Sequence, residues 1–112
     1  MRSPSISAAI ITKNEEINIE KCLKSIPPEI DTVVLDAHST DNTIALAKYL
    51  GARVFTEVFT GFGMQKQKAV SKCRHSWVLI IDADEALSAD LASEILSISP
   101  TSDTIAYQVK RQ

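Results

Sequence analysis

The stretch Trp77-Val-Leu-Ile-Ile-Asp82-Ala-Asp84-Glu85 joins an apolar run directly to three carboxylates. A continuous apolar run predicts a strand that is covered on both faces, as in a parallel sheet, because a half-exposed strand would alternate apolar and polar residues. The carboxylates then follow at the carboxyl end of the strand, where open α/β sheets bind their ligands. This stretch therefore predicts both a fold class and the place of a binding site.

Strands and helices alternate along the rest of the chain. Further strands are expected at Ser5–Thr12, Thr32–Asp36, Arg53–Thr56 and Thr104–Val109. Apolar residues at helical spacing predict helices around Ile19, Leu23 and Ile26, around Ile44, Ala47 and Leu50, and around Leu87, Leu91, Ile95 and Ile98; another helix is expected from about Met64 to Arg74. This order predicts βαβ units in a three-layer α/β/α, Rossmann-like domain with a mainly parallel sheet.

Polar residues and one glycine mark the expected helix ends. Asn14, followed by Glu15 and Glu16, is expected to start the first helix, Asp41 to precede the second and Ser88 to precede the last. Gly51 stands where a glycine commonly ends a helix.

Composition indicates an ordinary globular domain and limits its partners. The 112 residues are 45% hydrophobic and 23% charged, with a net charge of −2, which excludes disorder and argues against a nucleic-acid surface. A bound phosphate is therefore expected to come with a metal ion. The apolar run Ala8–Ile11 is too short for a signal sequence or a membrane span, and we interpret Cys22 and Cys73 as buried free thiols in a reducing cytoplasm.

The acidic residues at the strand ends allow two interpretations each. Asp36 can contact a bound ligand, or it can cap the next helix. Asp41 could provide that cap instead. The sequence from Asp82 to Glu85 can be a solvated acidic turn before Ser88, or it can be a cation-binding site. Two unit charges 4 Å apart repel by about 4 kcal/mol at an effective dielectric constant of 20, which favours a cation. Mg²⁺ or Mn²⁺ suits such oxygen ligands.

Four stretches, in this order, resemble the motifs of family 2 glycosyltransferases of the GT-A fold, and most of all the lipopolysaccharide or lipooligosaccharide core β-1,4-glucosyltransferase group. They are Thr12-Lys-Asn-Glu-Glu16, Asp36-Ala-His-Ser-Thr-Asp41-Asn-Thr43, Gly61-Phe-Gly-Met-Gln-Lys66 and Trp77-Val-Leu-Ile-Ile-Asp82-Ala-Asp84-Glu85. The resemblance covers about Ser5 to Ile95, and its strength lies in the order of the four motifs, since D-x-D alone is a weak signal.

The resemblance implies a role for each matching residue. Asp36 would accept a hydrogen bond from uracil, Thr12 and its neighbours, Asn14 among them, would line the base and ribose pocket, and Lys66 would reach the nucleotide. Asp82 would bind ribose and Asp84 would bind the metal, Mg²⁺ or Mn²⁺. The expected function is the binding of a UDP-sugar, with UDP-glucose as one candidate, for inverting transfer to a lipopolysaccharide-type or other glycan, or to a lipid-linked acceptor.

Two features depart from the family pattern. Ala37-His38 stands where a small residue and a glycine are usual, so His38 is expected to be strained if that turn needs a positive φ. His38 can also be a nucleotide contact or a solvated turn residue. Beyond Lys110 nothing matches the acceptor-binding half that supplies the catalytic base, so the chain is expected to be the nucleotide-sugar-binding part, in one domain over residues 1–112, of a fragment, a truncated product or a split enzyme.

Other functions and settings follow as alternatives. A nonenzymatic nucleotide-binding or regulatory remnant would keep the pocket without the base, whereas a receiver-like domain would need an acidic pair where this chain has Lys13-Asn14. The interpretation places the protein in the cytoplasm and admits peripheral association with the inner face of the membrane. A shortened sheet would leave an edge open for self-association.

Overall fold

The computed structural model describes residues 6–97 and the strand at residues 105–108. Within this part, five parallel strands form one sheet in the order β3-β2-β1-β4-β5. The strands are β1 (Ile6–Thr12), β2 (Asp31–Asp36), β3 (Arg53–Thr56), β4 (Trp77–Ile80) and β5 (Ile105–Gln108), and the helices are α1 (Ile19–Lys24), α2 (Thr43–Tyr49), α3 (Phe62–Ser71) and α4 (Ala89–Leu96). The order and the parallel pairing confirm the predicted Rossmann-like α/β fold.

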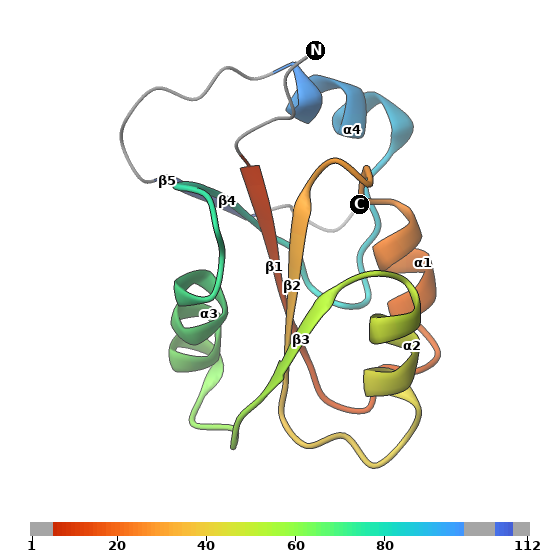
Figure 1. The fold of residues 1–112 in the computed structure, drawn as a ribbon, viewed down its shortest axis with the longest axis vertical. Helices are drawn as coiled ribbons and strands as arrows, with labels where there is room; N and C mark the ends of the chain where they lie inside the picture. The colour runs from red at the N-terminus through yellow and green to blue at the C-terminus, as the bar shows by residue number, and fades with distance from the viewer. Residues whose placement is uncertain (1–5, 98–104, 109–112) are drawn as a thin grey trace.

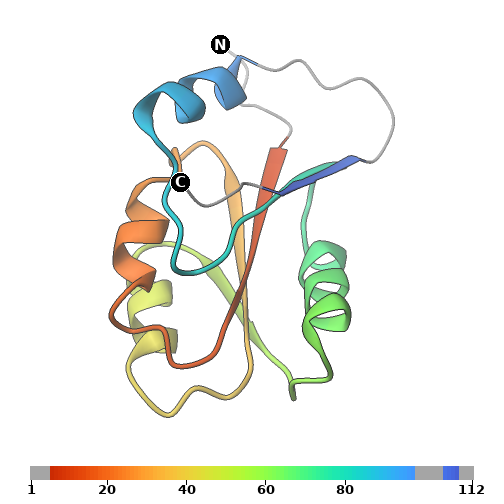
Figure 2. The same ribbon diagram turned by 180° about the vertical axis from the view of Figure 1, so that it is seen from behind.

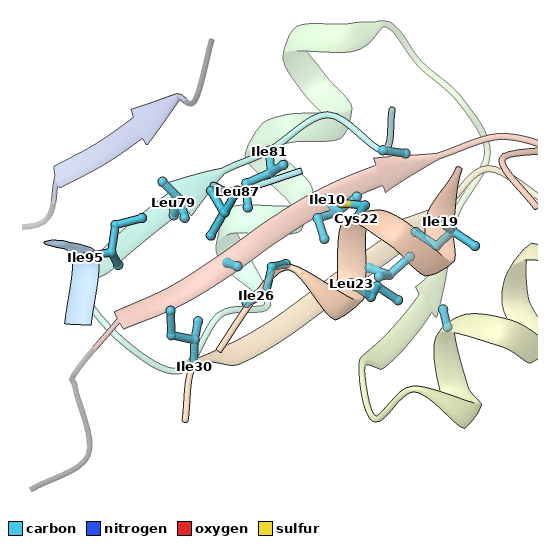
Figure 3. Packing of buried hydrophobic residues seen from close by; sticks show 14 of the residues in the cluster. Ile10, Ile19, Cys22, Leu23, Ile26, Ile30, Leu79, Ile81, Leu87 and Ile95 are labelled. Atoms are coloured by element: carbon cyan, nitrogen blue, oxygen red, sulfur yellow. The ribbon is translucent and has the colours of Figure 1, made fainter. Parts of the chain in front are cut away.

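Helices cover both faces of the sheet. Figures 1 and 2 show α1 and α2 on one face and α3 on the other, with α4 beyond the amino ends of the central strands. Successive residues of a strand point to opposite faces. Ile10 accordingly packs in the cluster under α1 and α2, whereas Ala9 packs with Ala69 of α3. Figure 3 shows the larger cluster, in which side chains of α1 lie against β1 and β4.

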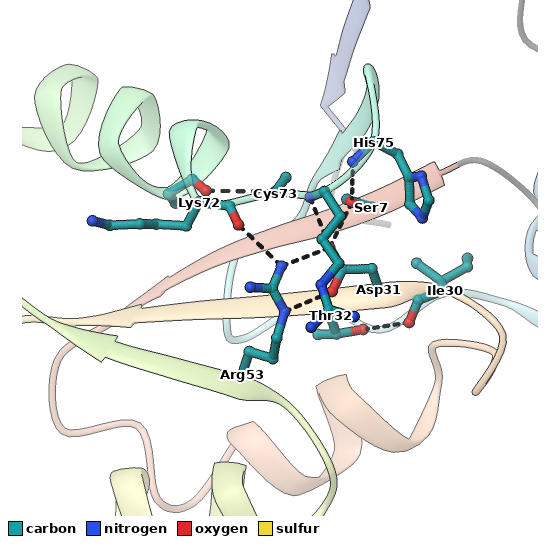
Figure 4. A network of polar contacts seen from close by, with 10 residues as sticks. Ser7, Ile30, Asp31, Thr32, Arg53, Lys72, Cys73 and His75 are labelled. Carbon is teal, nitrogen blue, oxygen red and sulfur yellow. Dashed lines mark hydrogen bonds and ion pairs between the residues drawn. The ribbon is translucent and has the colours of Figure 1, made fainter.

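A polar network ties the amino end of the sheet together (Figure 4). The Asp31 carboxylate accepts two hydrogen bonds of 2.8 Å from the Arg53 guanidinium and one of 2.7 Å from the buried hydroxyl of Ser7. The backbone N–H of Arg74 donates to the same carboxylate at 3.0 Å. Burial alone would raise the pKa of Asp31, but these hydrogen bonds outweigh it and lower the pKa to about 2. Asp31 therefore joins β1, β2, β3 and the end of α3 as an ion.

Replacing Asp31 by asparagine is expected to lower the free energy of unfolding at pH 7 by about 1–2 kcal/mol, because Arg53 loses its charged partner. Since the folded-state pKa lies below the ordinary value of 3.8, this stabilisation is present above about pH 4 and is lost as the pH falls towards 2. Urea unfolding from pH 7 to pH 2.5 measures it. The difference in unfolding free energy between wild type and variant should vanish on acidification. The control Asp90→Asn removes an exposed charge from the first turn of α4 and should cost at most about 0.5 kcal/mol at pH 7.

The first helix begins later than predicted. It starts at Ile19, after Asn18, and not near Asn14. Asn14 has a φ of +52°, which is incompatible with a right-handed helix. The next two backbone N–H groups, of Glu15 and Glu16, donate to Thr43 Oγ1 and to Asp41 Oδ2 at 2.8 and 3.2 Å. Side chains more than twenty residues away thus take the place of a helical turn.

Other element ends differ by a few residues. β4 ends at Ile80, so Asp82 lies in the following turn, and α3 runs from Phe62 to Ser71. Ser88 caps α4 as predicted, with its hydroxyl accepting from Leu91 N, while Leu87 precedes that helix. Ile98 lies outside the described residues. Both cysteines are free as predicted, but Cys73 is only half-buried because it follows α3 at the edge of the smaller core.

Candidate functional site

The predicted residues gather at the carboxyl edge of the sheet. Thr12 ends β1 and pairs in register with Asp36, which ends β2. The turn that holds Asp82 and Asp84 follows β4, the other neighbour of β1. α3 begins at this same edge, which is the lower edge in Figure 1. The parallel topology therefore brings together residues as far apart in the sequence as Thr12 and Asp84.

A cavity of about 270 Å³ lies between this edge and the start of α3. Lys66, Asp82 and Asp84 all line it, and its remaining wall consists of Ile11, Glu15, Phe62 and Ala83. One cation and three carboxylates thus face the same space. The structure brings together three of the six residues that the sequence assigned to nucleotide-sugar binding.

A second, smaller cavity of about 100 Å³ shares Ile11, Glu15 and Phe62 with the first. Its other lining residues are Thr12, Lys13, Ala37, Phe59 and Gln65. Half of the eight lining residues are apolar or aromatic, and these supply most of the exposed wall. Such a lining suits a flat, uncharged ring, whereas the charges of the larger cavity suit a diphosphate and its metal. Thr12 is the fourth predicted residue that reaches a cavity.

Asp36 lies beneath this surface and not on it. Its side chain is 0% exposed, and its carboxylate accepts hydrogen bonds of 2.6 Å from Thr12 Oγ1, from Ser39 Oγ and from the Ser39 N–H. Asp36 does not cap α2 either: the N-cap is Asn42, and the carboxylate of Asp41, just before it, accepts from the first helical N–H, that of Thr43, at 2.9 Å. The Thr43 hydroxyl is the main cause of the lowered pKa of Asp41. The direct contact between Asp36 and a base stays a prediction.

Asn14 braces the loop that follows β2. Its Oδ1 accepts from Thr40 N at 2.8 Å, and its own N–H donates to Ser39 Oγ at 2.7 Å. Lys13 Nζ donates to the backbone oxygens of Ala37 and His38. His38 has a φ of +56°, so the positive φ that was expected to strain this residue is present. Asn14 lines neither cavity, and its assignment to nucleotide-sugar binding stays a prediction.

The acidic turn after β4 is fixed from below. Glu85 is 6% exposed, and its Oε1 accepts from the backbone N–H of Asp82 at 2.9 Å. Ser25 Oγ, at the end of α1, accepts from Leu87 N at 2.9 Å. The Cys22 thiol, whose pKa is raised to about 12 by burial and then by the nearby carboxylates, stays protonated and donates to the Asp82 carbonyl oxygen. Glu85 thus shapes the turn, whereas Asp84 is exposed.

The lining of the larger cavity fits a divalent cation that brings ligands of its own. Among the described residues no group of three histidine, cysteine or acidic side chains is placed to hold a metal ion by itself. Mg²⁺ usually takes one or two carboxylates and completes its shell with phosphate oxygens and water. Asp84 can supply an oxygen ligand of this kind, and Lys66 supplies a further positive charge for a phosphate.

Sequence reasoning missed two polar residues of this region. Gln65 and Ser25 were not singled out, although Gln65 lines the smaller cavity and Ser25 holds the acidic turn. A signal for Gln65 was present, since it lies inside the motif Gly61-Phe-Gly-Met-Gln-Lys66, one position before Lys66. Nothing in the sequence distinguishes Ser25 from an ordinary helix-end serine.

The strand order and the acidic edge agree with a GT-A type glycosyltransferase fold, and the likeness to solved structures shows this fold. Solved structures that are similar to the chain include glucosyl-3-phosphoglycerate synthase from Mycobacterium tuberculosis in complex with Mn²⁺, uridine diphosphate and glucosyl-3-phosphoglycerate. The identity is 30% and the TM-score 0.64, over 72% of this chain and 35% of the synthase. The same enzyme has also been solved with Mg²⁺ and uridine diphosphate, at the same identity and TM-score.

The model of glycosyl transferase family 2 matches residues 7–108, and the chain belongs to this family. An uncharacterized glycosyltransferase of Rickettsia felis is 44% identical over 94% of this chain and 38% of its own length. The lipopolysaccharide core biosynthesis glycosyltransferase LpsC of Rhizobium meliloti is 37% identical over 96% of this chain and 42% of its own length. The chain thus spans about two fifths of these curated relatives. Within its described part, none of the helices has the length and apolar character needed to cross a membrane.

Proposed function

We propose that residues 1–112 form the nucleotide-sugar-binding part of a family 2 glycosyltransferase, which binds a UDP-sugar with Mg²⁺ or Mn²⁺. The observation that carries the proposal is the meeting of Lys66, Asp82 and Asp84 on one cavity at the carboxyl edge of the sheet. The uridine diphosphate and metal ions named for the similar synthase support the same ligand class.

Different residues of the chain bind the metal, the ribose and the diphosphate. Asp84, exposed on the turn after β4, holds the metal, and Asp82, half-buried beside it, contacts the ribose. Lys66 places a positive charge against the diphosphate. Asp36 accepts a hydrogen bond from Thr12 and so fixes the position of this residue, which lines the smaller cavity. When bound, the metal supplies charge stabilisation to the departing diphosphate.

The acceptor is proposed for the complete protein, because the chain spans only about two fifths of its curated relatives. The similarity to LpsC supports a glycan acceptor of the lipopolysaccharide type. Inverting transfer requires a base that deprotonates the acceptor hydroxyl, and we assign that role to no residue described above. Nucleotide binding by the complete protein without transfer to any acceptor would favour the alternative of a regulatory remnant.

Thermal unfolding with and without UDP-glucose and Mn²⁺ tests the proposal. At a hundred times the dissociation constant, binding adds about 2.7 kcal/mol of stability, which raises Tm by several degrees. Asp84→Ala is expected to remove the part of the rise that depends on Mn²⁺. Asp90→Ala deletes an exposed carboxylate that lines neither cavity, and it should leave the rise intact. A folded wild-type protein whose Tm does not respond would contradict the proposal.

A further inference from the structure

Gln65 carries a buried polar atom that has no hydrogen-bond partner in the described part of the chain. The residue is 1% exposed in α3, and among the described residues its Oε1 accepts no hydrogen bond. Buried polar groups are nearly always paired, and an orphaned carbonyl oxygen destabilises the protein that contains it. Natural sequences keep such local defects mainly at functional sites. The side chain therefore points to a ligand that is absent from the free protein.

The place of Gln65 indicates which part of a ligand it meets. Gln65 lines the smaller cavity together with Thr12 and with two aromatic rings, those of Phe59 and Phe62. The two rings contact each other edge to face, with centroids 5.1 Å apart. The exposed wall of this cavity is mainly apolar and aromatic, although Lys13 and Glu15 also line it, and with its one amide and one hydroxyl it suits a flat heterocycle better than a phosphate or a sugar. The charged groups that suit a diphosphate line the adjoining cavity.

Gln65 is also better placed than Asp36 to bind a base. The Asp36 carboxylate is fully buried and already accepts three hydrogen bonds, from Thr12 and Ser39. The Gln65 amide has an unused acceptor, and a side-chain amide offers both a C=O and an NH₂ group. A base edge with a ring N–H next to a carbonyl, as in uracil, matches both groups at once.

We propose that Gln65 is a base-recognition residue, whose amide pairs with the ring N–H and the neighbouring carbonyl of the nucleobase in the smaller cavity. The inference rests on the proposed binding of a nucleotide sugar and adds a specificity-determining residue to it. The base reaches Oε1 by displacing the ring of Phe59 or Phe62, both of which are exposed. Binding then removes the cost of the orphaned oxygen, so the amide favours the bound state.

The variant Gln65→Met tests this role, because methionine keeps the length and helix propensity of glutamine without its polar atoms. Titration calorimetry with UDP and Mn²⁺ should show an affinity roughly tenfold lower than in the wild type. Inorganic pyrophosphate with Mn²⁺ carries no base, and its affinity should not change. Gln67→Met makes the same replacement at an exposed position of α3 and should bind both probes like the wild type.

The unfolding temperature of the free protein gives a second readout. Gln65→Met should unfold at or above the wild-type temperature, because the variant buries no unpaired oxygen. A fall of several degrees, or an unchanged affinity for UDP, would overturn the role of Gln65 and leave the proposed function standing. A folded wild-type protein that binds pyrophosphate but not UDP would overturn both.

Discussion

Asp36→Ala is expected to lower the free energy of unfolding by about 3 kcal/mol. The carboxylate is completely buried, and three donors converge on it at 2.6 Å from Thr12 and Ser39. Alanine leaves those donors in the interior without an acceptor. Nucleotide binding should weaken as well, because Thr12 lines the smaller cavity and Ser39 Oγ also accepts a hydrogen bond from the Asn14 N–H.

Urea unfolding of three proteins measures this effect. Asp36→Asn retains an oxygen that can accept from Ser39 N, so its loss should be only about 1 kcal/mol. Asp90→Ala removes an exposed carboxylate and should lie within about 0.5 kcal/mol of the wild type. A loss below 1 kcal/mol for Asp36→Ala would mean that the three donors find other partners, and it would remove the structural role assigned to Asp36.

The fold was predictable because its signals are local. The apolar runs of β1, β2 and β4 are continuous, and Gly51, with a φ of +92°, ends α2 as glycines commonly do. The segment from Asn14 to Asn18 was mispredicted for the opposite reason. Its acidic residues look like a helix start, but Ser39, Asp41 and Thr43 bind its backbone N–H groups from across the chain. Contacts between distant loops leave no periodic pattern in a single sequence.

The candidate site was predictable in place but not in detail. Residues at the ends of neighbouring parallel strands must share one edge, so the meeting of Lys66, Asp82 and Asp84 follows from the topology. The topology does not determine which polar residues face the interior of the protein. Glu85 was grouped with the metal-binding carboxylates, yet it turns into the protein to accept from Asp82 N. Gln65 is buried because α3 turns that face towards the sheet, and an isolated glutamine does not reveal this.

Ile10→Ala is expected to lower the free energy of unfolding by about 3–4 kcal/mol. Ile10 lies in the strand that leads to the carboxyl edge of the sheet, so the candidate site depends on its packing. Ile10 is 0% exposed in the central strand β1, two residues before Thr12. Its side chain lies in the cluster with Cys22, Ile19 and Leu23 of α1, as Figure 3 shows. Alanine leaves a cavity between sheet and helix that neither can close without moving.

A matched replacement separates this burial effect from the change of side chain itself. Ile17→Ala makes the same substitution in the loop before α1, where the isoleucine is 91% exposed, and it should change stability by less than about 0.5 kcal/mol. Similar losses in the two variants would show that Ile10 is not packed as described. If the packing holds, Ile10→Ala should also weaken nucleotide binding at a temperature where the protein is still folded, because α1 supports the turn of Asp82 through Cys22 and Ser25.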